Sequence, residues 1–149
     1  MVTSKKYEMA ETYQTIAEGN FLAFCKDTIP SVKDFNIKIS MFEESGVEVE
    51  YFPDEYRVGK TDKFWTQSLF TIADLVSYGC IFTRYPTAIP SVTTNMNANF
   101  FDTTHVCNVR ANGKIQEYGE NFAHSTVDVV TFQGMPIAKF TCNYLIVLS

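Results

Sequence analysis

The chain has 149 residues, of which 46% are hydrophobic and 19% are charged, and its formal net charge is −5 at pH 7. This length and balance are typical of one globular domain with a sizeable core. A nucleic-acid-binding protein normally carries a stripe of basic side chains that neutralises phosphates, and this acidic chain has no basic run, so we expect no nucleic-acid partner.

No stretch reaches the roughly 18 uncharged apolar residues of a membrane-spanning helix. The first residues lead into a polar segment and not into the apolar part of a secretory signal, which favours the cytosol. Four cysteines are scattered without a C-x-x-C pair: Cys25, Cys80, Cys107 and Cys142. We expect them to be reduced and to act as small core side chains. His105 and His124 have no partner at ligand spacing, so we expect no metal ion and no cofactor.

The first third of the chain changes its hydrophobic period. Apolar residues within 4–29 recur at roughly helical spacing with Gly19-Asn20 between them, which predicts two short helices that end before Pro30. From residue 35 apolar and polar side chains alternate, and they alternate again after the turn signal Ser45-Gly46. This pattern predicts a β-hairpin.

The longest uncharged run follows, from Phe64 to Thr83, with Asp74 as its single charge. Its length predicts a helix of about 30 Å, and Asp62 is suited to cap its N-terminus. Such a helix is apolar on nearly every face and belongs in the middle of a protein.

Four extended segments complete the chain, at residues 91–101, 103–111, 115–131 and 136–148. Asn112-Gly113 is a strong hairpin signal between the second and third segments, and Gln133-Gly134 joins the third to the fourth. The order of elements predicts a single α+β domain with a four-stranded meander after the central helix. Residues 1–33 form a helical extension, and residues 34–149 form the core.

Two segments carry a resemblance to a known family. Leu69-Phe70-Thr71-Ile72-Ala73-Asp74-Leu75 and the later Ser91-Val92-Thr93-Thr94-Asn95-Met96-Asn97-Ala98-Asn99-Phe100-Phe101 resemble the phenylacetyl-CoA thioesterase-like branch of the hotdog superfamily. The resemblance covers roughly residues 35–148. It implies the hotdog fold, in which an antiparallel sheet wraps one long helix, and a homo-oligomer that is a dimer or a dimer of dimers.

The resemblance also implies a reaction, the hydrolysis of an acyl-CoA thioester at a site shared by two subunits. Asp74 matches the family's general base or nucleophile, and Thr93 matches a hydroxyl residue that helps to place the water. A backbone amide near Trp65 and Thr66, at the helix N-terminus, would polarise the thioester carbonyl. General chemistry agrees, because a carboxylate among apolar side chains resists ionisation and suits a general base. A helix N-terminus stabilises a developing oxyanion.

The chain departs from the family pattern at the start of this helix. Family members commonly have histidine-glycine-glycine where this chain has Trp65-Thr66-Gln67, and many have an asparagine where this chain has Gly59. Trp65 can fill the space where a thioester enters, and Gln67, two turns from Asp74 on the same face, can supply a polar group. Phe64, Trp65, Phe70 and Tyr78 suggest an apolar pocket, although the same residues also suit a core.

Alternative functions therefore stay open. The chain can be a non-catalytic hotdog module that binds acyl-CoA or only dimerises, in which Asp74 hydrogen-bonds a neighbouring strand without chemistry. A hydratase of the same fold usually pairs a histidine with the acid, and neither histidine is near the helix in sequence. A cone-shaped ligand-binding α+β domain is a further alternative for the fold, but it would place more helices before its first strand.

Overall fold

The computed structural model describes residues 21–53, 63–84, 91–103 and 106–146. Helix α2 (Phe21–Thr28) and the short 3-10 helix η1 (Pro30–Val32) precede the sheet. The end of α2 just before Pro30 is confirmed, whereas the predicted helix before Gly19 lies outside the described residues. Asp62, the expected cap of the central helix, and Gly59 lie outside them too.

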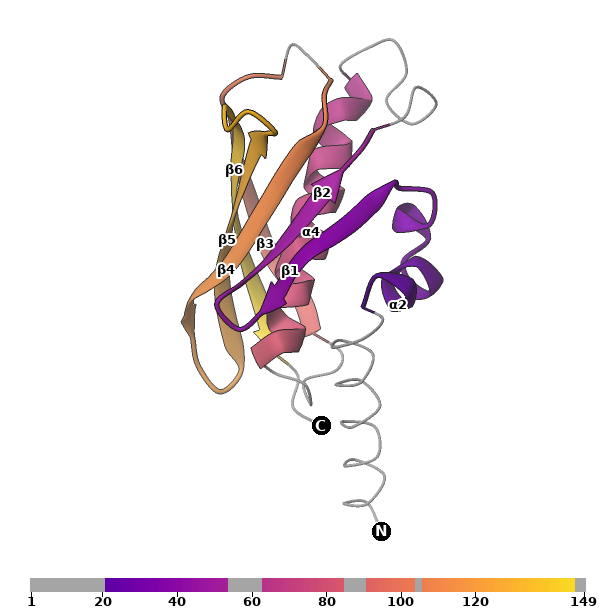
Figure 1. Ribbon diagram of the computed structural model, residues 1–149. Helices are drawn as coiled ribbons and strands as arrows, with labels where there is room; N and C mark the ends of the chain where they lie inside the picture. Colours follow the sequence, from indigo (N-terminus) through magenta and orange to yellow (C-terminus); the bar gives the residue numbers. More distant parts are fainter. Residues whose placement is uncertain (1–20, 54–62, 85–90, 104–105, 147–149) are drawn as a thin grey trace.

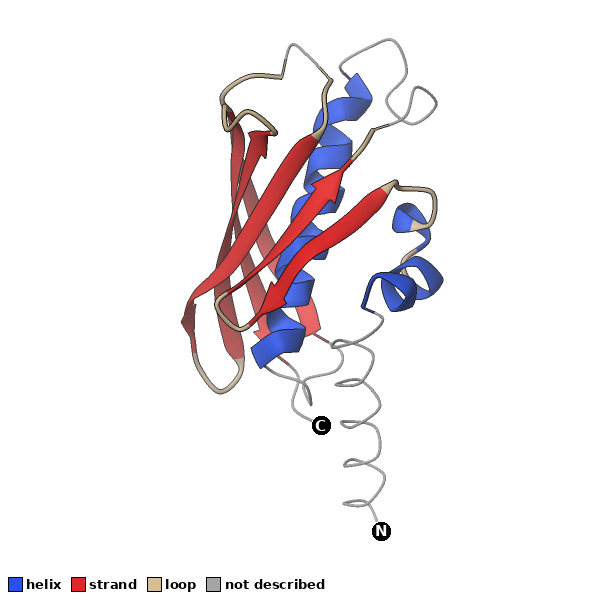
Figure 2. Cartoon of the chain, in the orientation of Figure 1, coloured by secondary structure: helices blue, strands red, loops and turns tan. Residues whose placement is uncertain are grey.

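One long helix and one sheet form the body of the protein. The helix α4 (Lys63–Arg84) covers the predicted run and extends it by one residue at each end. The six strands are β1 (Ile37–Glu43), β2 (Gly46–Tyr51), β3 (Ser91–Phe100), β4 (Val109–Tyr118), β5 (Phe122–Thr131) and β6 (Pro136–Ile146). They pair antiparallel in the order β1-β2-β4-β5-β6-β3. This single layer of strands bends around α4, which is the expected architecture (Figures 1 and 2).

The core fills the space between α4 and the inner face of the sheet. Trp65, Leu69, Ile72 and Val76 recur at helical spacing and are fully buried. Alternate strand residues face them, as the period of two requires. Burying one such side chain contributes about 1.5–3 kcal/mol relative to leaving it exposed, so this face holds helix and sheet together.

The predicted turn at Asn112-Gly113 is wrong. Both residues lie within β4, where Gly113 pairs with Val47 of β2 and with Val127 of β5. A Cβ atom at Gly113 would lie 2.5 Å from Cγ1 of Val76 on α4. The glycine therefore lets helix and sheet approach closely, and the β4–β5 turn lies further on, at residues 119–121.

The predicted meander holds for three strands but not for four. β4, β5 and β6 are neighbours in both sequence and space, and Gly134 makes the β5–β6 turn with φ of +90°. β3 instead pairs with β6 at the far edge of the sheet. One long edge of β3 therefore has no partner strand among the described residues.

The cysteines behave as predicted for core side chains. All four are free thiols; Cys25, Cys80 and Cys142 are buried and Cys107 is half-buried. Burial raises the pKa of Cys25 and of Cys80 to about 12, so both are protonated at neutral pH. Among the described residues, no helix is long and apolar enough to cross a membrane.

Candidate active site

Asp74 lies on the side of α4 that the sheet does not cover. Its neighbours Ala73 and Leu75 are buried, whereas Asp74 is exposed, and so are Phe70 one turn earlier and Gln67 two turns earlier. We call Gln67, Phe70 and Asp74 the open stripe of α4, because residues at this spacing share one helix face. Asp74 is therefore exposed in the single chain, and the expectation that two subunits share its site stays a prediction.

Two hydroxyl groups bind one oxygen of the Asp74 carboxylate. The Tyr144 phenol donates to Oδ1 at 2.7 Å, and the Thr93 hydroxyl donates to the same oxygen at 3.1 Å. Hydrogen bonds to a charged acceptor are shorter and about twice as strong as neutral ones. No described residue bonds to the second oxygen, Oδ2. The carboxylate is thus held at one oxygen and presented at the other.

A β-bulge in the edge strand turns Thr93 toward the helix. Thr93 pairs with Tyr144 and Asn95 pairs with Asn143, so Thr94 is an extra residue between two register positions. The Thr94 hydroxyl donates to the main-chain oxygen of Asn143 at 3.2 Å, which ties the bulge to β6. A bulge changes which residues of a strand share a face. Thr93 therefore faces inward with Tyr144, although strict alternation would place it with Asn95.

Tyr144 is a functional candidate that the sequence reasoning missed. Tyr144 is only 3% exposed. This burial, together with the nearby charge of Asp74, raises the pKa of the Tyr144 phenol well above its ordinary value. At neutral pH the phenol is consequently a hydrogen-bond donor. A pattern of inward residues along β6 places Tyr144 in the core layer, but no sequence signal tells which helix residue it meets.

Three phenylalanine rings meet beside the open stripe. The Phe70 ring centroid lies 5.1 Å from that of Phe140 and 5.9 Å from that of Phe100, and all contacts are edge-on. Phe140 is fully buried, whereas Phe70 and Phe100 are each 36% exposed. An apolar surface therefore begins one helical turn from Asp74.

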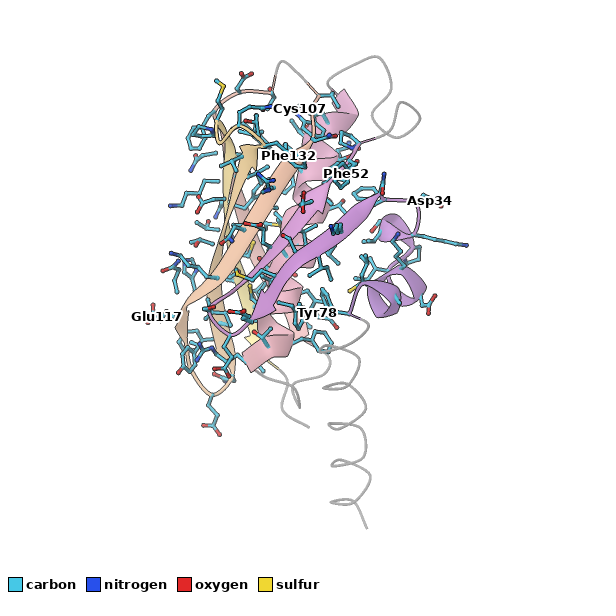
Figure 3. The ribbon with its side chains drawn as sticks, in the orientation of Figure 1. Asp34, Phe52, Tyr78, Cys107, Glu117 and Phe132 are labelled. Atoms are coloured by element: carbon cyan, nitrogen blue, oxygen red, sulfur yellow. The ribbon has the colours of Figure 1, made fainter. Side chains whose placement is uncertain are left out.

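The other aromatic residues suggested for a pocket lie elsewhere. Trp65 is fully buried, and its ring stacks on Tyr51 at a centroid distance of 6.2 Å. Tyr78, labelled in Figure 3, contacts Phe21 of α2 and lies on the opposite flank of the helix from the β3 edge. The side chain of Phe64 lies outside the described residues. Trp65 therefore occupies the core of its own chain and not a substrate entrance.

The residues predicted for the oxyanion site lie far from Asp74 along the helix. Thr66 is half-buried and Gln67 is exposed on the open stripe. Asp74 lies nine positions after Trp65, which corresponds to about 13 Å along an α-helix. A single chain therefore brings Thr93 to Asp74 but does not bring the amides of the first turn to it.

The described histidine is also remote from Asp74. Nδ1 of His124 lies 2.7 Å from the side-chain oxygen of Asn143, and both residues point to the outer face of the sheet. His105 lies outside the described residues. No group of three or more metal-ligating side chains forms within the part of the chain that the structure describes. The described histidine, His124, therefore does not place an imidazole beside the acid, as the hydratase alternative would need.

Comparison with known proteins identifies the fold. No family model matches the chain, and no curated protein matches it. The structure is similar to a thioesterase family protein from Silicibacter pomeroyi, with a TM-score of 0.74 and 13% identity over 87% of this chain and 97% of the other. It is also similar to a hypothetical thioesterase from Streptococcus pneumoniae solved with coenzyme A, with a TM-score of 0.69 and 17% identity over 84% and 98%.

A Streptococcus mutans protein bound to acetyl-CoA has the same arrangement, with a TM-score of 0.68 and 17% identity over 76% of this chain and 90% of the other. Identities at this level show shared architecture. The expectation of the hotdog fold, the one found in thioesterase-family proteins, is confirmed.

Proposed function

We propose that this hotdog-fold chain hydrolyses an acyl-CoA thioester, with Asp74 as general base or nucleophile. Similar structures include a thioesterase family protein, a hypothetical thioesterase solved with coenzyme A, and a further protein bound to acetyl-CoA. Because one fold serves many functions, the proposal depends on the residues of the site and not on the fold alone.

The observation that carries the proposal is the hydrogen bonding of the Asp74 carboxylate, which within the described part of the chain uses only one of its two oxygens. Its Oδ1 accepts two hydroxyl hydrogen bonds, and its Oδ2 has no partner among the described residues. Here the free oxygen belongs to an exposed residue beside an apolar surface, where an acyl group and a water molecule have access.

The chemistry follows from that free oxygen. As a general base, Oδ2 accepts a proton from water while the water oxygen bonds to the thioester carbonyl carbon. The resulting oxyanion collapses, the carbon–sulfur bond breaks, and the CoA thiolate takes the proton back from Asp74. As a nucleophile, Oδ2 itself bonds to the carbonyl carbon, the thiolate leaves, and water then hydrolyses the acyl–aspartate anhydride.

A second copy of the chain completes the site in this proposal. The amides of the first turn of α4 are about 13 Å from Asp74 in the same chain, so they serve as oxyanion donors only for an Asp74 of another subunit. The edge of β3 that has no partner strand among the described residues supports an assembly, because Val92, Phe100 and the next residue, Phe101, are exposed. A long exposed edge is normally covered. We propose a homodimer or a dimer of dimers.

A hydrolysis panel tests the reaction. Short, medium, long and aromatic acyl-CoAs are incubated with the wild type, with Asp74→Asn and with Asp128→Asn, and the released CoA thiol is measured. Asp128 is an exposed aspartate of β5 and is the matched control. We expect hydrolysis of at least one ester by the wild type and by Asp128→Asn, and its loss in Asp74→Asn. Equal activity in all three proteins would exclude Asp74 as the base.

The alternative function is a module that binds acyl-CoA without hydrolysing it. The replacement of the usual histidine-glycine-glycine by Trp65-Thr66-Gln67 favours it. A wild type that hydrolyses no ester of the panel, yet binds CoA esters in calorimetry, would establish this alternative in place of the enzyme.

Sedimentation tests the assembly. We expect a mass of at least two chains at micromolar concentration, and a larger mass for a dimer of dimers. A species with the mass of one chain would remove the shared site from the proposal.

A further inference from the structure

The phenol of Tyr144 lies close to both the side chain and the main chain of Asp74. The phenol oxygen lies 2.7 Å from the carboxylate Oδ1 and 3.2 Å from the main-chain oxygen of the same residue. A phenol has one hydrogen, and the shorter distance and the charge of the acceptor both favour the carboxylate. The phenol therefore donates to Oδ1 and fixes the carboxylate relative to β6.

We infer that Tyr144 is a positioning residue of this site, which holds the Asp74 carboxylate so that Oδ2 faces the open side of α4. The inference rests on the proposed thioesterase function and adds a residue to it. Thr93 binds the same oxygen from the neighbouring strand, so the two hydroxyls clamp the carboxylate from opposite strands of one register pair.

The need for such a clamp follows from the exposure of Asp74. An exposed aspartate populates several rotamers, and ordering it costs free energy in each catalytic cycle unless the protein has ordered it beforehand. A reacting group has to be held to within about half an ångström of its productive position by neighbours that are themselves fixed. Tyr144 meets this condition, since it is 3% exposed and belongs to β6, an inner strand paired on both sides.

A filler role for the ring does not account for the hydroxyl. Phenylalanine would fill the same space without the cost of burying a polar group. The hydroxyl is directed at the one charged residue of α4 between Phe64 and Thr83.

Few titratable groups influence the phenol of Tyr144. Titratable groups that act on it are Asp74 of α4 and Cys142 of β6, while Thr93 of β3 is a neutral hydrogen-bond partner. Burial is the largest cause of the raised pKa of the phenol, and the negative charge of Asp74 is the second. Removal of the charge at Asp74 should therefore let the phenol ionise at lower pH, while burial keeps it harder to ionise than a free tyrosine.

The kinetic test is a double-mutant cycle on the acyl-CoA that the wild type hydrolyses best. One charged hydrogen bond is worth enough to change a rate by roughly 10–100-fold. We expect Tyr144→Phe to lower kcat by about that factor, with KM changed by less than about twofold. In the Asp74→Asn background the same change should lower the residual rate by less than about threefold. Tyr118→Phe, at an exposed tyrosine of β4, is the control and should leave activity unchanged.

An equal loss in both backgrounds, or a loss that appears only in KM, would overturn the inference. Thermal melting of each variant shows whether it is folded. A merely structural role would lower stability and change the rate by the same factor with or without the carboxylate.

A second measurement needs no catalysis. Tyrosine labelled with ¹³C at Cζ reports ionisation by NMR, and the signal that is missing in Tyr144→Phe belongs to Tyr144. We expect its titration to move to lower pH in Asp74→Asn. An unchanged titration overturns the inference whatever the activity. If the wild type hydrolyses nothing while the titration moves, the proposed function fails and the contact between Tyr144 and Asp74 stands.

Discussion

The two sides of α4 have opposite relations to the sheet. The core side, formed by Trp65, Leu69, Ile72 and Val76, is fully buried against the strands. The open stripe of Gln67, Phe70 and Asp74 is exposed, and at one flank Phe70 and Asp74 contact residues of β3 and β6. Substitutions on the core side should change stability, and substitutions on the open stripe should change chemistry. The sheet determines which residues of α4 belong to the core side and which to the open stripe, because it covers one side of the helix only.

The largest effect is expected at Asp74. Asp74→Asn keeps the size of the side chain and should lower kcat by about 10²–10⁴-fold, which is a barrier increase of roughly 3–5 kcal/mol. Because the carboxylate is exposed, we expect the free energy of unfolding to change by less than about 1 kcal/mol. Steady-state kinetics and urea unfolding measure the two quantities. A large loss of stability with unchanged kcat would mean that Asp74 has a structural role, like the residues of the core side.

Ile72 provides the opposite case on the core side. Ile72→Ala leaves a cavity between helix and sheet and should lower the free energy of unfolding by about 2–5 kcal/mol. In the folded fraction kcat should stay within about threefold of the wild type, since Ile72 is buried on the core side of α4 and not on the open stripe. Unfolding in urea gives the first value. A loss of activity comparable to that of Asp74→Asn, in protein shown to be folded, would break the distinction between the two sides.

Gly113 tests how closely the core side approaches the sheet. Gly113→Ala would bring Cβ to 2.5 Å from Val76, so we expect a loss of about 1–3 kcal/mol from overpacking. The double variant Gly113→Ala, Val76→Ala relieves the clash and should be more stable than the sum of the single changes predicts. Additive losses would show that the glycine is required for another reason.

Thr93 should give the smallest effect. Thr93→Val keeps the shape and removes the weaker of the two hydrogen bonds to Oδ1, at 3.1 Å, so we expect kcat to fall by roughly 3–10-fold. Tyr144→Phe should cost more, because its bond is shorter. The reverse order in kcat would mean that Thr93 has a further role, such as holding the attacking water.

The elements with a clear local pattern were predictable. The long helix predicted over residues 64–83, the first hairpin and the turn at Gln133-Gly134 each depend on neighbouring residues, and all are confirmed. The turn of the first hairpin lies one residue earlier than the Ser45-Gly46 signal, at residues 44–45. Asn112-Gly113 has the composition of a turn but lies within β4. Gly113 is needed there because the side chain of Val76, more than thirty residues away in the chain, leaves no room for a Cβ atom. Sequence patterns report local preference, and this contact overrides it.

The candidate site divides in the same way. Asp74 stands out in the sequence as one charge in an apolar helix, and Thr93 was reached through the family resemblance. Neither pattern shows that Asp74 is exposed, because a helix becomes one-sided only when a sheet covers it. Tyr144 was not found, since its role depends on the register between β3 and β6 and on the bulge at Thr94.

The sequence by itself determined the class of the fold, the long helix and the residue that carries its charge. These follow from periodicity and composition, which act over a few turns or one hairpin. Only the tertiary structure decided that β3 pairs with β6, that Val76 packs directly against Gly113, and that two hydroxyls bind one oxygen of Asp74. Those outcomes depend on contacts between residues as much as 70 positions apart in the chain, such as Tyr144 and Asp74, which no local pattern encodes.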